Sequence, residues 1–231
     1  MPLDLHRVRA LCFDVDGTLS DTDDQWVQRM ENALQPVRFL FGCRELRHVV
    51  RRLVMGMETP GNRIYHWLDH LHLDDDVAKV AGKFTAQRAR HAGGFWIIPH
   101  VKESLLRLAP HYPLAVVSAR DQHTTLDFLD QFELTHLFKT VVTAQTCEYT
   151  KPYPHPVEYA ARQMGVSPRD CLMIGDTVVD IRAGKAAGAQ TVGVLCGFGE
   201  ENELRQAGAD LILPSTAHLA EILLPEGAPE G

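Results

Sequence analysis

The sequence lacks the features that direct a protein to nucleic acid or to a membrane. Lysine and arginine total 23 against 30 acidic residues, and no run of basic residues supplies a footprint for nucleic acid or an acidic lipid surface. No apolar stretch approaches the ~18 residues of a membrane-spanning helix, and the N-terminus lacks the apolar core of a signal peptide. We therefore expect a cytoplasmic protein without a nucleic-acid or membrane partner; its oligomeric state is left open.

The cysteines also lack any pattern that builds a fold. Five of them are present, an odd number, and they are widely spaced with no Cys-x-x-Cys pair. This spacing indicates neither a disulfide framework nor a structural zinc site. Cys12 and Cys171 lie inside apolar runs and are expected to be ordinary core residues.

Strand-like and helix-like segments alternate over most of the chain. Short apolar runs typical of buried strands stand at residues 10–13, 114–117, 140–143, 171–174, 191–195 and 210–213. Amphipathic, helix-like segments lie between them, near residues 100–111, 121–133, 154–165, 178–188 and 200–207. This alternation predicts an α/β fold with a doubly wound parallel sheet.

One long interval breaks the alternation. Residues 21–92 contain helical patterns and no convincing strand, and this block is too long for an ordinary crossover between parallel strands. We expect it to form an inserted all-helical domain, with residues 1–20 and 93–225 making up the α/β core. The tail, residues 226–231, has no large apolar residue and is expected to be disordered.

Polar residues follow the predicted strands where a parallel sheet binds its ligands. Asp14 and Asp16 follow the first strand, Ser118 the second and Asp176 the fourth, while Lys151 precedes the helix after the third. Paired acids beside an apolar run are costly unless a cation meets them, so this edge of the sheet predicts a site for a divalent metal or for phosphate. A simple Asp-Gly turn is the alternative for the first pair alone.

Four segments, in order, resemble the motifs of the haloacid dehalogenase superfamily, and in particular its phosphoglycolate phosphatase-like branch. They are residues 14–19 (DVDGTL), 117–119 (VSA), 151–152 (KP) and 175–180 (GDTVVD). The resemblance implies a Rossmann-like core, a helical cap inserted after the first motif, and Mg²⁺-dependent phosphoryl transfer to an aspartate. The expected substrate is a small phosphorylated metabolite, such as phosphoglycolate or a sugar phosphate.

The resemblance also assigns roles to the residues in these motifs. Asp14 becomes the nucleophile, because a carboxylate can attack phosphorus and split one displacement into two. Asp16 becomes the general acid and base. Mg²⁺ is held by the Asp14 side chain, the Asp16 carbonyl and the Asp176 side chain.

Further residues are expected to bind phosphate or to support the site. Ser118, Ala119 and Lys151 hold the phosphoryl oxygens, with Lys151 also offsetting charge during transfer. Asp180 orients a metal-bound water or Lys151. The structural alternatives are a helix N-cap for Ser118, a solvated surface position for Lys151 and a simple helix-face acid for Asp180.

Substrate selection is assigned to less specific features. A loop-like segment of the cap, residues 55–63, contains Thr59 and Arg63, and Arg120 follows the second motif. Thr59 and Arg63 are candidates for contacts with the organic part of the substrate. Arg120 is a candidate for contact with a substrate anion, and the alternative for it is a surface position at the start of a helix.

Other functions remain open from the sequence alone. They are a phosphomutase, a haloacid dehalogenase and a non-catalytic phosphate-sensing module. The acid at Asp16 disfavours the dehalogenase, since halide leaves without a proton.

Overall fold

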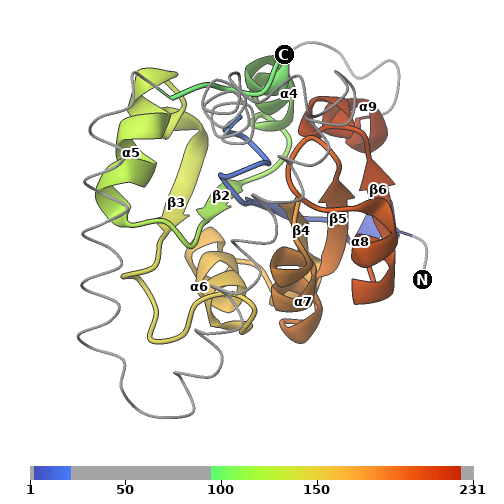
Figure 1. Cartoon of the computed structure of the whole chain (residues 1–231). Helices are drawn as coiled ribbons and strands as arrows, with labels where there is room; N and C mark the ends of the chain where they lie inside the picture. Colours follow the sequence, from blue (N-terminus) through green and yellow to red (C-terminus); the bar gives the residue numbers. More distant parts are fainter. Residues whose placement is uncertain (1–2, 22–94, 225–231) are drawn as a thin grey trace, which may run out of the picture. The chain divides into compact units, whose positions relative to one another are not determined.

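The computed structural model describes residues 3–21 and 95–224, and these residues form an α/β core around one parallel sheet (Figure 1). Six strands lie in the order β3-β2-β1-β4-β5-β6, and every neighbouring pair is parallel. The strands are β1 (Ala10–Phe13), β2 (Leu114–Val117), β3 (Phe138–Val142), β4 (Cys171–Gly175), β5 (Gln190–Val194) and β6 (Leu211–Leu213). The predicted doubly wound sheet is confirmed.

The first strand lies between β2 and β4, where the order of the strands along the chain reverses. Cys12 of β1 pairs with Ala115 on one side and with Met173 on the other. In an open α/β sheet, ligands bind outside the carboxyl ends of the strands at such a reversal. The residues that follow β1 and β4 are therefore in the position that favours a ligand site.

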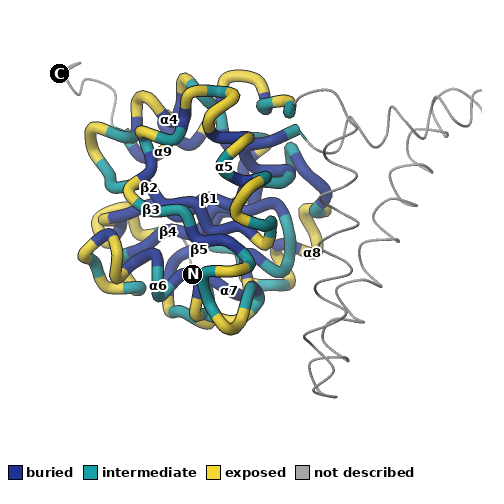
Figure 2. Tube along the Cα trace, turned by 90° about the vertical axis from the view of Figure 1, so that its left-hand side faces the viewer, coloured by how far each residue is buried: buried dark blue, intermediate teal, exposed yellow. Residues whose placement is uncertain are grey.

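Helices cover both faces of the sheet, which explains why its central strands are continuously apolar. Figure 2 shows the buried sheet as a layer with α4, α5 and α9 on one side and α6 and α7 on the other. The α-helices are α4 (Val101–Leu108), α5 (Gln122–Gln131), α6 (His155–Met164), α7 (Val178–Ala186), α8 (Glu201–Ala207) and α9 (Leu219–Leu223). Short 3-10 helices span Leu5–Arg7, Thr135–Leu137, Pro168–Asp170 and Thr216–His218.

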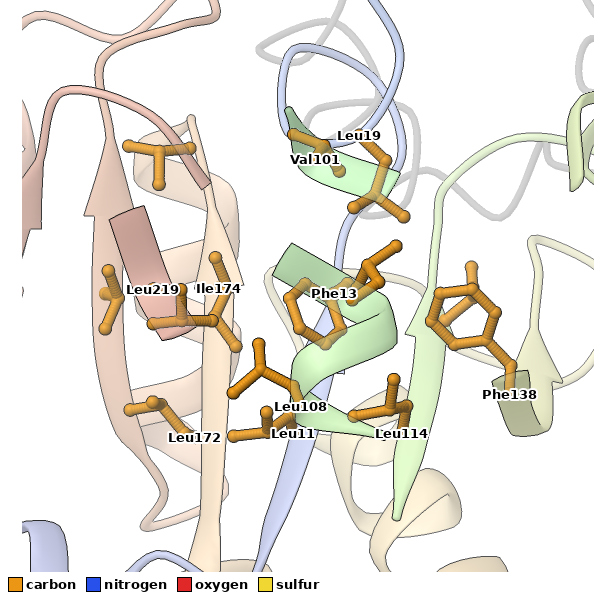
Figure 3. Close-up of a cluster of buried hydrophobic side chains, with 14 of the residues drawn as sticks. Leu11, Phe13, Leu19, Val101, Leu108, Leu114, Phe138, Leu172, Ile174 and Leu219 are labelled. Carbon is orange, nitrogen blue, oxygen red and sulfur yellow. The ribbon is translucent and has the colours of Figure 1, made fainter. Parts of the chain in front are cut away.

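Alternate side chains of the central strands β1, β2 and β4 enter two apolar layers, one on each face of the sheet. Leu11 and Phe13 of β1 pack with Leu108 of α4 and Leu219 of α9, as Figure 3 shows. Ala10 and Cys12 face the other layer, where smaller residues allow α6 to approach the sheet closely. Both layers hold the strand ends firmly, so side chains just beyond them have defined positions.

The predicted segments agree with the structure to within a few residues. The strand at 10–13 and the strand at 114–117 have the expected bounds, whereas β3 begins at Phe138, two residues before the predicted start. Helix α9 was not predicted, because five residues are too few for a helical period to show. The predicted cap, apart from Asp21, and the predicted tail lie outside the described residues. No helix in the described part of the chain is long and apolar enough to cross a membrane.

Candidate active site

The turn after β1 places two acidic side chains at the carboxyl edge of the sheet. The backbone N–H of Asp14 continues the ladder by donating to the Ile174 carbonyl, at 2.9 Å. The chain then turns through Gly17, whose φ of +70° favours glycine. A Cβ on Gly17 would also lie 2.3 Å from Asp176 Oδ2. Glycine is therefore needed here both for the backbone conformation and for space.

Lys151 bridges two buried carboxylates. Its Nζ lies 2.6 Å from Asp14 Oδ1 and 2.6 Å from Asp180 Oδ1. The side chains of Lys151, Asp14 and Asp180 are only 4%, 9% and 1% exposed. Lys151 is therefore not a solvated surface residue, and Asp180 is not a simple helix-face acid.

A second set of contacts fixes Asp180 at the start of α7. Its Oδ2 accepts hydrogen bonds from the Thr177 backbone N–H, at 3.0 Å, and from the Thr177 hydroxyl, at 2.6 Å. This capping box leaves Oδ1 directed to Lys151. The helix start therefore determines where the Lys151 ammonium sits.

Burial and charge shift the ionisation of this cluster. Burial raises the pKa of Asp14 from 3.8 to about 7; the carboxylates of Asp180 and Asp16 add to the rise and Lys151 opposes it. Burial alone would lower the pKa of Lys151, but the adjacent carboxylates of Asp14 and Asp180 outweigh it and raise that pKa above its ordinary value. Lys151 is therefore a permanent cation, whereas ionised Asp14 is costly without a further positive charge.

Asp176 lies beside this cluster, fully buried and in contact with the backbone of the loop after β5. Its Oδ2 accepts the Phe198 backbone N–H at 2.8 Å, and its Oδ1 is 3.4 Å from the Thr18 hydroxyl. A Cβ on Gly197 would lie 2.1 Å from Asp176 Oδ2, so the loop after β5 can approach this closely only with glycine. The loop thus holds the carboxylate in one orientation.

The donor set fits a hard divalent cation. Asp14, Asp176 and Asp180 each offer a carboxylate oxygen, and these oxygens lie within 4.8 Å of one another. The cluster holds three buried carboxyl groups and one ammonium, so when the carboxyl groups are ionised it carries surplus negative charge that a bound cation would offset. Oxygen ligands from carboxylates are those that Mg²⁺ and Ca²⁺ prefer.

The second motif lies next to the turn after β1. Ser118 is 5% exposed, its backbone N–H donates to the Val142 carbonyl, and its hydroxyl accepts the Arg120 N–H at 3.1 Å. Asp121, not Ser118, caps α5 through a bond from the Thr124 N–H. Ala119 is exposed. Arg120, expected to meet substrate, contacts the Asp16 carboxylate.

Comparison with known proteins decides the family. The sequence profile of the haloacid dehalogenase-like hydrolases matches residues 11–194, which is well over half of the chain. The protein belongs to the haloacid dehalogenase-like hydrolase family. This finding confirms the resemblance seen in the four motifs.

Several known proteins align with this hydrolase over nearly its full length. A phosphoglycolate phosphatase of Chromobacterium violaceum is 26% identical over 226 residues, covering 96% of this chain and 99% of the relative. A pyrophosphatase, PpaX, of Oceanobacillus iheyensis is 26% identical over 218 residues, covering 94% and 97%. A crystal structure of a HAD family hydrolase from Deinococcus radiodurans, with bound phosphate and sodium, is 26% identical with a TM-score of 0.68, covering 95% and 99%.

Three residues that shape the site of this hydrolase were not expected from the sequence. Thr18, Gly197 and Phe198 all contact or crowd Asp176. The glycine-rich stretch after β5 was the available signal for the Asp176 loop. Thr59, Arg63 and the segment 55–63 lie outside the described residues, so their suggested contacts with substrate stay a prediction.

Proposed function

We propose that the protein is a Mg²⁺-dependent phosphatase that hydrolyses a small phosphorylated metabolite through an aspartyl phosphate on Asp14. The observation that carries the proposal is the buried cluster in which Lys151 lies 2.6 Å from both Asp14 and Asp180, beside Asp176. A carboxylate paired with a permanent cation at the carboxyl edge of the sheet is suited to meet a phosphoryl group. The named activities of the relatives support the same reaction.

In the first half-reaction, an oxygen of Asp14 attacks phosphorus and the bond from phosphorus to the ester oxygen breaks. The leaving alkoxide takes a proton from Asp16, which becomes a carboxylate. In the second half, water attacks the aspartyl phosphate while Asp16 takes its proton. Inorganic phosphate leaves, and both Asp14 and Asp16 return to their starting states.

Lys151 and the second motif hold the phosphoryl oxygens during both steps. The Lys151 ammonium is fixed by Asp180, so it needs no reorganisation when negative charge develops. Ser118 contributes its hydroxyl, and Ala119 contributes its backbone N–H. Lys151 thus acts on the transferred group, and Asp180 acts by positioning Lys151.

Mg²⁺ fits the remaining carboxylate oxygens. The Asp14 side chain, the Asp16 carbonyl and the Asp176 side chain are the proposed ligands, with Asp180 close by. The bound ion would offset the carboxylates' charge and polarise phosphoryl oxygens. Such an ion would favour the ionised form of Asp14 at neutral pH despite the burial of this side chain.

The proposed substrate is a metabolite-sized phosphate ester, and phosphoglycolate and sugar phosphates are the first candidates. The relatives' names motivate phosphoglycolate and pyrophosphate as test compounds. We also propose that the segment 21–92 is a helical cap that selects among such molecules, with Thr59 and Arg63 facing the substrate.

The testing experiment measures released phosphate, with and without Mg²⁺, over a panel that includes phosphoglycolate, sugar phosphates, p-nitrophenyl phosphate and pyrophosphate. Asp14→Asn serves as the inactive control, expected to lose at least ~10³-fold in turnover. A rapid acid quench with labelled substrate should place the label on Asp14. Label on another residue, or none, contradicts the covalent route.

The same panel separates the other functions. Isomerisation of a sugar phosphate without net phosphate release indicates a phosphomutase. Chloride release from a haloacid indicates a dehalogenase. Phosphate binding without turnover of any compound indicates a sensing module.

A further inference from the structure

Arg120 is held in place by its backbone and by an aromatic ring. Its N–H donates to the Ser118 hydroxyl at 3.1 Å, and its carbonyl accepts the Ala144 N–H at 2.9 Å. Its guanidinium carbon lies 5.4 Å from the centroid of the Phe95 ring, a distance typical of a cation-π contact. The side chain therefore extends from a fixed loop across a fixed surface.

The Phe95 ring is itself fixed. It packs edge-on against Phe128 of α5, with centroids 5.9 Å apart. The Phe95 backbone N–H donates to the Gln131 side chain at 3.0 Å, and the Gln131 amide donates back to the Phe95 carbonyl at 2.8 Å. Helix α5 thus supports the surface on which the guanidinium rests.

The guanidinium of Arg120 contacts the Asp16 carboxylate at two points. Nε lies 2.7 Å from Asp16 Oδ2, and Nη2 contacts Asp16 Oδ1. The two side chains are 17% and 33% exposed, so the pair is partly screened from water. A two-point contact of a planar guanidinium with a carboxylate fixes direction as well as distance.

We propose that Arg120 is a positioning residue for Asp16, setting the direction in which this carboxylate exchanges its proton with the leaving group. The inference rests on the proposed function, in which Asp16 is the acid and base. One of the two contacts is exchanged for the proton and the leaving oxygen, and the other keeps the side chain aligned. Misplacing a reacting group by about 1 Å can cost ~10²-fold in rate.

This role differs from the direct contact with substrate expected from the sequence. A residue that binds substrate equally in the ground and transition states changes KM for every ester alike. A residue that acts through Asp16 changes kcat, and does so most where the leaving group needs a proton. The two roles therefore predict different patterns across leaving groups.

The experiment compares an alkyl phosphate that the enzyme hydrolyses with p-nitrophenyl phosphate, whose leaving group needs little protonation. Arg120→Ala should lower kcat by about 10- to 100-fold for the alkyl ester and by less than about 3-fold for the aryl ester. Arg120→Lys should have a kcat for the alkyl ester between those of Arg120→Ala and wild type, because an ammonium restores the charge without the two-point contact. In an Asp16→Asn background, Arg120→Ala should add less than about 2-fold.

Arg205→Ala is the matched control, since it removes an exposed arginine that pairs with Glu201 on α8. It should leave both rates within about 2-fold of wild type. Equal losses for the two esters in Arg120→Ala, a change confined to KM, or an undiminished loss in the Asp16→Asn background overturns the positioning role.

Failure of the inference is distinguishable from failure of the proposed function. If Asp16→Asn itself slows both esters equally, then Asp16 is not the acid and the proposed mechanism fails. If Asp16→Asn shows the leaving-group dependence while Arg120→Ala does not, only the role of Arg120 is wrong. Thermal unfolding of each variant, with Tm near that of wild type, separates these outcomes from loss of the fold.

Discussion

Replacing Asp14 by Asn should abolish activity and yet stabilise the metal-free protein. The raised pKa of Asp14 means that the folded state holds its proton more tightly than the unfolded chain does between pH 3.8 and about 7. The contribution of Asp14 to folding stability therefore falls as the pH rises through this window. Asn removes the charge and keeps an oxygen that can accept a hydrogen bond from Lys151.

The size of the effect follows from the pKa values. At about 1.4 kcal/mol per pH unit, a rise from 3.8 to about 7 corresponds to a cost of roughly 4 kcal/mol at pH 8. At pH 5 the folded protein keeps the proton, and the cost is only roughly 1–2 kcal/mol. Relaxation of a buried site lowers such figures, so we expect a gain of about 1–3 kcal/mol for Asp14→Asn at pH 8, or a Tm rise of about 3–8 °C.

The assay is thermal unfolding of both proteins with EDTA at pH 8 and at pH 5, repeated at pH 8 with Mg²⁺. In EDTA the variant should have a higher Tm than wild type, and this difference in Tm should be smaller at pH 5 than at pH 8. Mg²⁺ should stabilise wild type more than the variant, because binding to the folded state adds to stability. A variant less stable than wild type in EDTA at pH 8, or a difference that does not shrink toward pH 5, would refute the electrostatic account.

Three further substitutions test other parts of the structure. Asp176→Asn should raise the Mg²⁺ concentration needed for half-maximal activity, since an anionic oxygen ligand is lost; an unchanged metal titration contradicts that role. Gly197→Ala should also raise the Mg²⁺ concentration needed for half-maximal activity, because its Cβ would lie 2.1 Å from Asp176 Oδ2. It should destabilise the fold by about 1–3 kcal/mol. Metal binding measured by calorimetry at wild-type affinity would show that the loop does not position Asp176. Phe128→Ala should cost about 3–5 kcal/mol in urea unfolding, because the ring is fully buried; a loss below about 1 kcal/mol contradicts the packing described around α5.

The predicted helices and strands were accurate where the pattern is strong and less so at short or irregular segments. The buried runs of β1 and β2 have the predicted bounds because a parallel strand covered on both faces must be apolar throughout. Helix α9 was missed because its single turn follows a 3-10 turn and carries too little periodic signal. The strength of the local pattern thus decided which elements could be predicted.

Within the candidate site, the sequence indicated residue types better than it indicated contacts. It placed Asp14, Lys151 and Asp176 near one edge of the sheet, since the ends of parallel strands converge there. It assigned Arg120 to the substrate, whereas the structure pairs that side chain with Asp16 across 104 positions of sequence. Nothing in the sequence around Arg120 or around Asp16 indicates that the two side chains pair.

The sequence by itself determined the order of strands and helices, the family motifs and the chemical groups available for catalysis, because these depend on short-range patterns and on residue identity. Only the tertiary structure decided the ionisation and the orientation of those groups. The rise in the pKa of Asp14, the hold of Asp180 on Lys151 and the close approach of Gly197 to Asp176 all depend on burial and on distances between segments far apart in the chain. Those distances are set by packing of the two helical layers against one sheet, which no local pattern encodes.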